Sequence, residues 1–347
     1  MNRTAIPWIL TVILALYVLG LEYLGKNGTA FDPTFEFYDT AQVSILVHGS
    51  VDRPPMGVFG EYNNVLEGEK QIVKGRSKGQ DFRLSFRVNS PRRAYLFAND
   101  EKLEIFLIPG DTSLKVHLYW DSFYDGLDSV AFEGQTASIC EYYAQKAQKF
   151  EEVNLITARH TFRNPNYDGF VARLDSAVAH ELLFLGGKEI TGELPPWFAM
   201  FEKNEILYNR IYLILTNAKN LRGAPDELPT MQISNPRAVF SYYYYLYLHA
   251  HFANLLQKKG DQASAFDVSQ ELALACAQLE GEVKDVYLSR IISRQLKRTG
   301  PNYAEQLLSQ HKEEFSSQRY VRFLQMSIQA KQDSLQAFSS TDGRPVF

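Results

Sequence analysis

The sequence predicts an α+β fold in which an N-terminal membrane anchor precedes an antiparallel β-sandwich or half-barrel and then an all-helical domain. An apolar run near the N-terminus, period-two alternation up to about residue 134, and helical spacing of apolar residues after it lead to this prediction. A sheet must cover its apolar face, so the strands should close over one interior. The expected segments are an anchor or signal peptide (1–25), a β-domain (38–134), a helical domain (135–338) and a tail (339–347).

The N-terminal segment is apolar from residue 5 to residue 21 except for Thr11. About 20 helical residues are needed to cross roughly 30 Å of hydrocarbon, so residues 5–24 are just long enough to span a membrane. A cleaved signal peptide is the alternative, but its best cleavage site, at residues 28–30, lies far from the apolar run. We therefore favour an uncleaved anchor. Arg3 precedes the run and should stay cytoplasmic, which places the rest of the chain outside.

The β-rich segment alternates apolar and polar residues. In its clearest run, Phe82, Leu84, Phe86 and Val88 alternate with polar side chains, as in a strand with one buried face. Turn residues between such runs predict a short-looped antiparallel meander. Further strands are expected at residues 43–47, 95–98, 103–108 and 113–120.

The rest of the chain has the pattern of helices with short breaks. Gly186 and Gly187 are expected to end the second helix, and Asn235 followed by Pro236 is expected to cap the fourth. Helices are predicted over residues 136–153, 166–187, 196–215, 236–256, 263–279, 283–297, 303–315 and 317–338.

Charge and motifs exclude several function classes. The net charge is −4, and basic residues cluster no more densely than at 91–93 or 258–259, which argues against a nucleic-acid partner. The sequence contains no zinc-protease, serine-hydrolase or phosphate-loop motif, so no catalytic residue is assigned. His249 and His251 are the only closely spaced histidines, and residues two apart on a helix point away from each other. No metal or cofactor is therefore expected.

The two cysteines are far apart in the sequence. Cys140 and Cys276 form neither a Cys-x-x-Cys pair nor a zinc-type spacing. Cys276 lies in an apolar run, where a small core residue is expected. A disulfide between the two requires an oxidising compartment and close approach of the side chains, which the sequence does not establish.

The run of tyrosines at 242–245, followed by Tyr247, is the most unusual local composition in the chain. Four consecutive residues circle a helix, so some of these rings should be buried. We favour a role in packing or between domains, with a sugar- or peptide-binding aromatic surface as the alternative. That candidate binding surface comprises Trp197, Tyr208, Tyr212, Tyr243, Tyr244 and Tyr247.

Several short motifs carry a family resemblance. The β-rich part contains VxIxV at 43–47, QDFxLxF at 80–86, EIFLIPGD at 104–111 and FEG at 132–134, and the helical part contains ISNP at 233–236 and GEVKDVYL at 281–288. In this order they resemble the N-terminal β-domain and helical middle region of membrane-attached, TlpA-type thiol–disulfide interchange proteins. The resemblance covers roughly residues 43–338.

The resemblance implies a thioredoxin-like domain after the helical part. Residues 337–347 resemble the opening of that domain, but no Cys-x-x-Cys occurs within the 347 residues. Thiol exchange needs an attacking thiolate and a resolving partner. The chain is therefore expected to be either a fragment of a larger oxidoreductase or a relative without the redox module, and whether it belongs to an enzyme stays open.

The expected function is that of a membrane-anchored, non-catalytic binding or scaffold region on the periplasmic side of a bacterial cell. Its expected partners are the membrane, through the anchor, and an envelope protein or peptide client. The alternatives are a fragment of a complete thiol–disulfide oxidoreductase, and a cell-envelope protein that binds glycans or peptides through its aromatic residues.

Overall fold

The computed structural model describes residues 41–48, 57–78, 81–99, 101–120, 127–150, 166–258 and 268–340. Within these residues the protein is a mixed α+β chain, with nine strands in two sheets followed by eight α-helices. The predicted order of a β-rich part and a helical part is confirmed.

Two predicted segments fall mainly outside this range. Residues 1–25, the predicted anchor, are not among the described residues, and of the predicted tail only residues 339 and 340 are. In the part of the chain that the structure describes, no helix combines the length and the apolar character needed to cross a membrane.

The strands form a five-stranded sheet of order β4-β5-β1-β8-β9 and a four-stranded sheet of order β3-β2-β6-β7. β5 shows the predicted alternation, with Phe82, Leu84 and Phe86 buried and Arg83 and Arg87 exposed. The strands are β1 (Ala41–His48), β2 (Val58–Asn64), β3 (Glu69–Lys74), β4 (Arg76–Lys78), β5 (Asp81–Val88), β6 (Arg92–Ala98), β7 (Glu101–Leu107), β8 (Lys115–Trp120) and β9 (Leu127–Glu133).

The strand order corrects the predicted antiparallel meander. β1 pairs antiparallel with β5, placing Ile45 opposite Leu84, but it pairs in parallel with β8, placing Val47 opposite Val116. A parallel pair requires a long connection, and six strands separate these two partners in the sequence. Alternation identifies the buried face of a strand but not the direction of its neighbour, so the pattern could not predict this pair.

Two glycines bring the sheets together. Gly60 on β2 faces Leu84 and Phe86 on β5, and a side chain at this position would collide with the Phe86 ring. At Gly75, β3 of one sheet leads directly into β4 of the other, and the Gly75 amide donates to the Val58 carbonyl over 2.8 Å. Glycine permits both close approaches because it has no Cβ.

The helices agree with most of the predicted segments. Helical propensity and amphipathic spacing predict that a helix is present more reliably than they predict the residues at which it begins and ends. Within the described residues they are α2 (Ala137–Lys149), α4 (Tyr167–Ile190), α5 (Pro196–Asn217), α6 (Tyr242–Lys258), α7 (Val268–Gln278), α8 (Gly281–Arg298), α9 (Pro301–His311) and α10 (Gln318–Ser340).

Two predicted helix boundaries are wrong. α4 continues through Gly186 and Gly187 and ends shortly before Gly192, whose φ of +73° suits a helix C-terminus. Leu185 is buried, so packing of the apolar face continues the helix into the glycine pair. Asn235 caps a 3-10 turn, η2 (Pro236–Ala238), rather than α6 itself.

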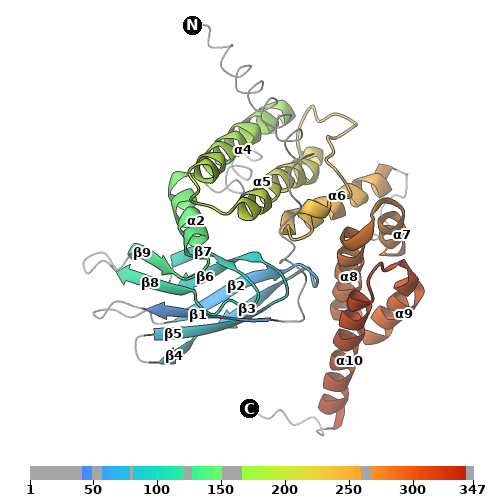
Figure 1. Ribbon diagram of the computed structural model, residues 1–347. Helices are drawn as coiled ribbons and strands as arrows, with labels where there is room; N and C mark the ends of the chain where they lie inside the picture. The colour runs from blue at the N-terminus through green and yellow to red at the C-terminus, as the bar shows by residue number, and fades with distance from the viewer. Residues whose placement is uncertain are drawn as a thin grey trace.

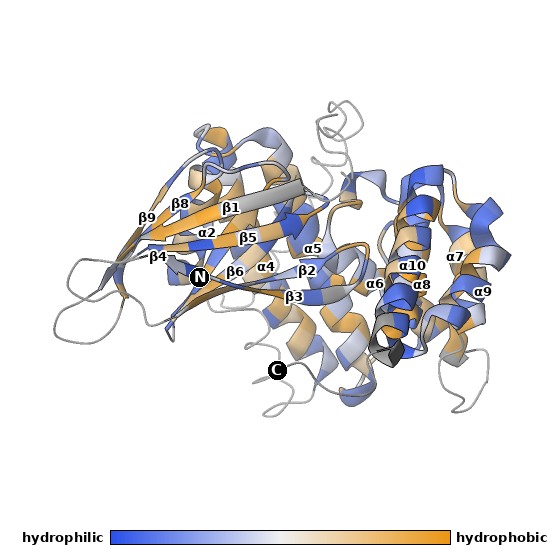
Figure 2. Cartoon of the chain, turned by 90° about the horizontal axis from the view of Figure 1, so that it is seen from below, coloured by the Kyte–Doolittle hydropathy of each residue, from blue (hydrophilic) through white to orange (hydrophobic). Residues whose placement is uncertain are grey.

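The two modules share one apolar core. Figure 1 shows the sheets at one end of the molecule, α4, α5 and α6 above them, and α7–α10 in a column at the side. α2 follows β9 and packs on β7 and β9. Apolar residues are concentrated along β1 and β8, whereas polar residues are prominent on α8 and α10 (Figure 2). Buried side chains of the strands and of the helices belong to a single continuous cluster.

Candidate functional site

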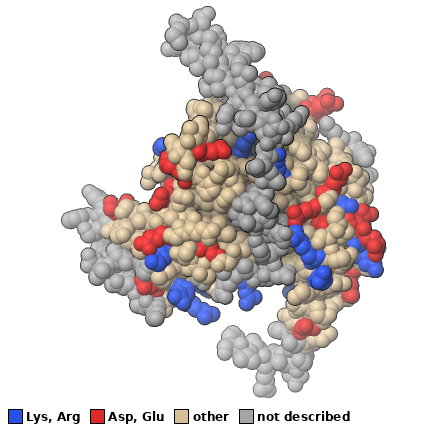
Figure 3. Space-filling view, viewed as in Figure 1, with Lys and Arg blue, Asp and Glu red and all other residues tan. Residues whose placement is uncertain are grey.

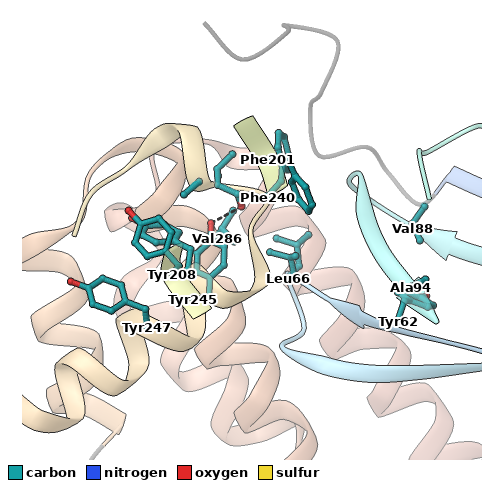
Figure 4. Packing of buried hydrophobic residues seen from close by; sticks show 14 of the residues in the cluster. Tyr62, Leu66, Val88, Ala94, Phe201, Tyr208, Phe240, Tyr245, Tyr247 and Val286 are labelled. Atoms are coloured by element: carbon teal, nitrogen blue, oxygen red, sulfur yellow. Dashed lines mark hydrogen bonds between the residues drawn. The ribbon is translucent and has the colours of Figure 1, made fainter. Parts of the chain in front are cut away.

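Three of the candidate tyrosines form a buried cluster. Tyr208 on α5 lies with its ring centroid 4.7 Å from that of Tyr244 and 5.4 Å from that of Tyr247, both on α6. All three side chains are completely buried. Figure 4 shows Tyr208 and Tyr247 on the helical side of the core, with Leu66 from the turn between β2 and β3 lying between them and the sheet. We call Tyr208, Tyr244 and Tyr247 the tyrosine cluster.

The hydroxyls of the tyrosine cluster hold one irregular segment of the chain. This segment, residues 228–235, is neither helix nor strand, and we call it the strap. Tyr247 donates to the Met231 carbonyl over 2.8 Å and accepts from the Met231 amide over 3.0 Å. Tyr244 donates to the Ile233 carbonyl and accepts from the Asn235 amide.

Tyr208 completes the pattern. Its hydroxyl donates to the Gln232 carbonyl over 3.1 Å and accepts from the Asn235 side-chain amide over 2.9 Å. Burial raises the pKa of Tyr208, Tyr244 and Tyr247 above the ordinary value. The hydroxyls therefore stay protonated, and each acts as both donor and acceptor.

The remaining candidate residues lie at the edges of the core. Trp197, Tyr212 and Tyr243 are half-buried and pack against it. The structure thus brings together three of the six candidates and covers their rings, which favours the packing interpretation over an open aromatic surface. Sequence could identify these tyrosines but not the strap that covers them.

Aromatic residues also join the two modules. Phe106 on β7 lies with its ring centroid 5.2 Å from Phe201 and 5.3 Å from Phe198, both on α5. The Trp197 ring is 5.9 Å from Phe106. Edge-to-face pairs of this kind stabilise beyond their buried area by about 0.5–1.5 kcal/mol each. Trp197 is therefore part of the junction between the modules.

A buried ion pair lies beside this aromatic junction. The Arg93 guanidinium on β6 lies 3.3 Å from Glu205 on α5 and 3.5 Å from Glu104 on β7. Its Cζ atom is 5.7 Å from the ring centroids of Tyr143 and Tyr243. Burial raises the pKa of Glu205, an effect that the positive charge of Arg93 opposes. Arg93 therefore compensates a carboxylate that the helical module buries.

A second buried carboxylate lies one turn earlier on α5. Glu202 accepts from the Tyr143 hydroxyl and from the Lys146 ammonium, each over 2.8 Å, and Lys146 also lies 2.7 Å from Glu181. Burial acts most strongly and would raise the pKa of Glu202, but the positive charges of Lys146 and Arg93 and the hydrogen bonds from Lys146 and Tyr143 together outweigh it, so this pKa is lowered. Lys146 on α2 thus joins carboxylates of α4 and α5 inside the protein.

The column of helices is tied to the turn between β2 and β3. Arg290 on α8 donates to the Val65 carbonyl over 2.5 Å, and Lys297 lies 2.8 Å from Glu67. The Arg290 guanidinium also lies over the rings of Tyr242 and Tyr245. The β-module is consequently fastened at two places, through α5 and through α8.

A polar cluster that the sequence did not reveal surrounds Glu271. This completely buried carboxylate on α7 accepts from Tyr287 over 2.7 Å and from Arg294 over 2.6 Å, and it lies 2.8 Å from Nδ1 of His249. His251, in contrast, is buried beside the Tyr247 and Phe252 rings. The two histidines thus face different surroundings.

Neither thiol has the surroundings of a redox-active cysteine. Cys140 is a buried free thiol whose pKa burial raises to about 12, and Cys276 is a half-buried free thiol whose pKa burial also raises. The disulfide considered from the sequence is not formed. Among the described residues, no group of three or more His, Cys, Asp or Glu side chains is arranged to hold a metal ion.

Neither of two concave features among the described residues is lined by the tyrosine cluster. A cavity of about 30 Å³, enough for about one water molecule, lies at the junction beside Arg92, Arg93 and Glu205. A wider surface groove on the five-stranded sheet includes Arg83 and Lys115, but Lys115 is paired with Glu133 over 2.9 Å. Both signs of charge are interspersed on the face seen in Figure 3.

One signal in the sequence could have located the junction, because Glu205 supplies the carboxylate of its buried ion pair with Arg93. Glu202 and Glu205 lie three residues apart in a largely apolar stretch, which puts both carboxylates on one side of a helix.

No protein-family model matches the chain, and no curated protein is significantly similar to it.

Proposed function

We propose that this chain is the membrane-anchored, non-catalytic binding and scaffold region of a TlpA-like thiol–disulfide interchange protein, on the extracytoplasmic side of a bacterial cell. The observation that carries the scaffold role is the junction between the modules. Arg93 joins β6 to α5, Arg290 joins α8 to the β2–β3 turn, and one core runs through both modules. A region built in this way would present its surfaces in a fixed mutual arrangement.

Residues of the family-like motifs have structural roles, which supports this proposal. Asn235 caps η2 through the Arg237 amide. Asp285 accepts from the amides of Ser316 and Ser317 over 2.8 and 2.9 Å, just before α10. These contacts stabilise turns and helix ends, as expected for a scaffold. Gly60 on β2 and Phe86 on β5 come from different sheets and approach each other closely. This contact supports the proposal that the two sheets pack face to face as a sandwich.

The surroundings of the thiols agree with a non-catalytic role for the described region. An exchange-active cysteine is accessible and has a lowered pKa. Cys140 is buried with a raised pKa, and Cys276 is half-buried with a raised pKa. Redox activity would therefore have to come from another domain.

Reporter fusions test the proposed location. Alkaline phosphatase fused after Phe347 should be active and should sediment with membranes, because that enzyme matures only outside the cytoplasm. The matched β-galactosidase fusion at the same position should be inactive. Active β-galactosidase with inactive phosphatase would refute the extracytoplasmic proposal.

The second candidate, a fragment of a complete oxidoreductase, rests on the resemblance of residues 337–347 to the start of a thioredoxin-like domain. Intact mass of the protein from its native membrane fraction separates the two. A mass near 39.7 kDa favours a region that acts without its own redox domain. A mass larger by about 100–150 residues, the size of one small domain, favours the oxidoreductase.

A further inference from the structure

The strap lies on the tyrosine cluster in the manner of a bound peptide. Four of its eight residues hydrogen-bond to the three hydroxyls, and nearly all of these bonds involve main-chain groups: the carbonyls of Met231, Gln232 and Ile233 and the amides of Met231 and Asn235. Main-chain bonding combined with side-chain anchors is how extended peptides are recognised.

The side chains of the strap divide into an inner and an outer set. Leu228, Met231 and Ile233 are half-buried and pack on the core, whereas Thr230 and Gln232 are exposed. The anchors Met231 and Ile233 are two residues apart, and the chain bends at Ile233 and Ser234. The core therefore receives apolar side chains of the strap, and the hydroxyls beside them bind its main chain.

We propose that the tyrosine cluster and the core surface under Met231 and Ile233 are a binding site for a short, uncharged peptide segment with apolar side chains two residues apart, and that the strap occupies this site as an intramolecular competitor. The inference rests on the proposed binding function and names its ligand class. A peptide fits better than a glycan because the three hydroxyls bind main-chain carbonyls and amides.

The strap is suited to local opening. It is irregular, its outer side is exposed, and it is held by side-chain hydroxyls and three half-buried anchors rather than by a ladder within a helix or sheet. Segments of this kind open without global unfolding. The apparent affinity for a peptide is then the intrinsic affinity reduced by the fraction of molecules with an open strap.

Fluorescence anisotropy with a labelled synthetic peptide tests the competition. The peptide has the sequence of residues 228–235, LPTMQISN, and the protein is the full chain. The double variant Met231→Ala/Ile233→Ala removes strap anchors without touching the cluster. It should bind the peptide at least about tenfold more tightly than wild type, because more molecules are open. The control Thr230→Ala changes an exposed side chain and should bind like wild type.

One further protein variant and one peptide variant test the binding site separately from the opening of the strap. Adding Tyr247→Phe to the double variant should abolish the gain, since the hydroxyl that bonds both main-chain groups of Met231 is lost. A peptide with proline in place of Met231 lacks the donated N–H and should bind at least about tenfold more weakly. Equal binding of the peptide to wild type and the double variant would overturn the proposal.

Hydrogen exchange on wild type decides the case if the double variant does not fold. The Met231 and Asn235 amides should exchange faster than the interior of α5, and faster still with saturating peptide, because the peptide takes their hydroxyl partners and displaces the strap. Exchange as slow as that of α5, unchanged by peptide, would show that the strap is a fixed part of the fold and would refute the site. Neither result alters the reporter-fusion outcome, so the two proposals can fail separately.

Discussion

The Arg93 guanidinium on β6 lies 3.3 Å from the Glu205 carboxylate on α5, so a strand of one module and a helix of the other share a buried ion pair. The Glu205 side chain is only 4% exposed and also accepts from the Ser241 hydroxyl over 2.6 Å. Removing one partner of such a pair leaves the other charge buried and uncompensated.

Replacing Arg93 with alanine should therefore reduce the free energy of unfolding by about 3–5 kcal/mol. Glu104 and Glu205 would both lose their positive partner. Urea unfolding followed by circular dichroism measures the change. Arg83→Ala, which removes an exposed arginine from β5, serves as the control and should stay within about 0.5 kcal/mol. Equal effects of the two substitutions would contradict the assigned role of Arg93.

The cluster around Glu271 joins α6, α7 and α8, so a substitution of Glu271 should also reduce the stability of the protein. Glu271→Gln keeps the shape but removes the charge that attracts Arg294 and the Tyr287 hydroxyl, which should lower stability by about 2 kcal/mol. Thermal unfolding provides the measurement. Glu280→Gln, at an exposed position just before α8, should leave the midpoint unchanged, and a comparable loss there would argue against a specific cluster.

Burial lowers the pKa of His251 below its ordinary value of 6.5. The native state then binds fewer protons than the unfolded state, so stability should fall as the pH drops below about 6.5 and level off below the folded-state pKa. His251→Leu should weaken this dependence between pH 7.5 and pH 5 in urea titrations. Exposed His180→Gln should keep the wild-type profile, and an unchanged profile in His251→Leu would disprove the assignment.

Thiol accessibility should distinguish the two cysteines. Burial raises the pKa of Cys140 to about 12, so this buried thiol stays protonated at pH 8. Ellman's reagent should therefore modify half-buried Cys276 first and Cys140 only on unfolding. Cys276→Ala should show almost no reaction in the native state, whereas Cys140→Ala should react like wild type. Rapid modification of Cys140 in the folded protein would contradict its placement in the core.

The sequence predicted the class of fold because periodicity reports burial. The alternation of residues 82–88 identified β5, and helical spacing identified α4 and α5. β2 and β3 were missed because their run 58–74 contains Gly60, Asn63 and Asn64 and few apolar residues at alternate positions. Pairing between strands that are distant in the sequence, as in β1 with β8, depends on the whole sheet and produces no local sequence pattern.

The candidate site was predicted in composition but not in arrangement. The tyrosine run indicated that aromatic residues matter, and the structure groups Tyr244 and Tyr247 with Tyr208. Their hydroxyls are bound by the strap, a mixed apolar and polar segment without the periodicity of a helix or strand. The partners of Arg93 come from separate elements, so only the folded chain brings them together.

The parallel pair of β1 and β8 also constrains how the chain can fold as it emerges. β1 is the first described strand to be synthesised and lies in the middle of its sheet, between β5 and β8. Its antiparallel partner β5 comes out early, but the register from Leu46 opposite Lys115 onward cannot form until nearly the whole β-module has followed. Contacts between such distant residues form slowly. A chain delivered vectorially would thus expose one flank of β1 for most of its passage, and a stall before β8 would leave an open strand edge prone to intermolecular pairing.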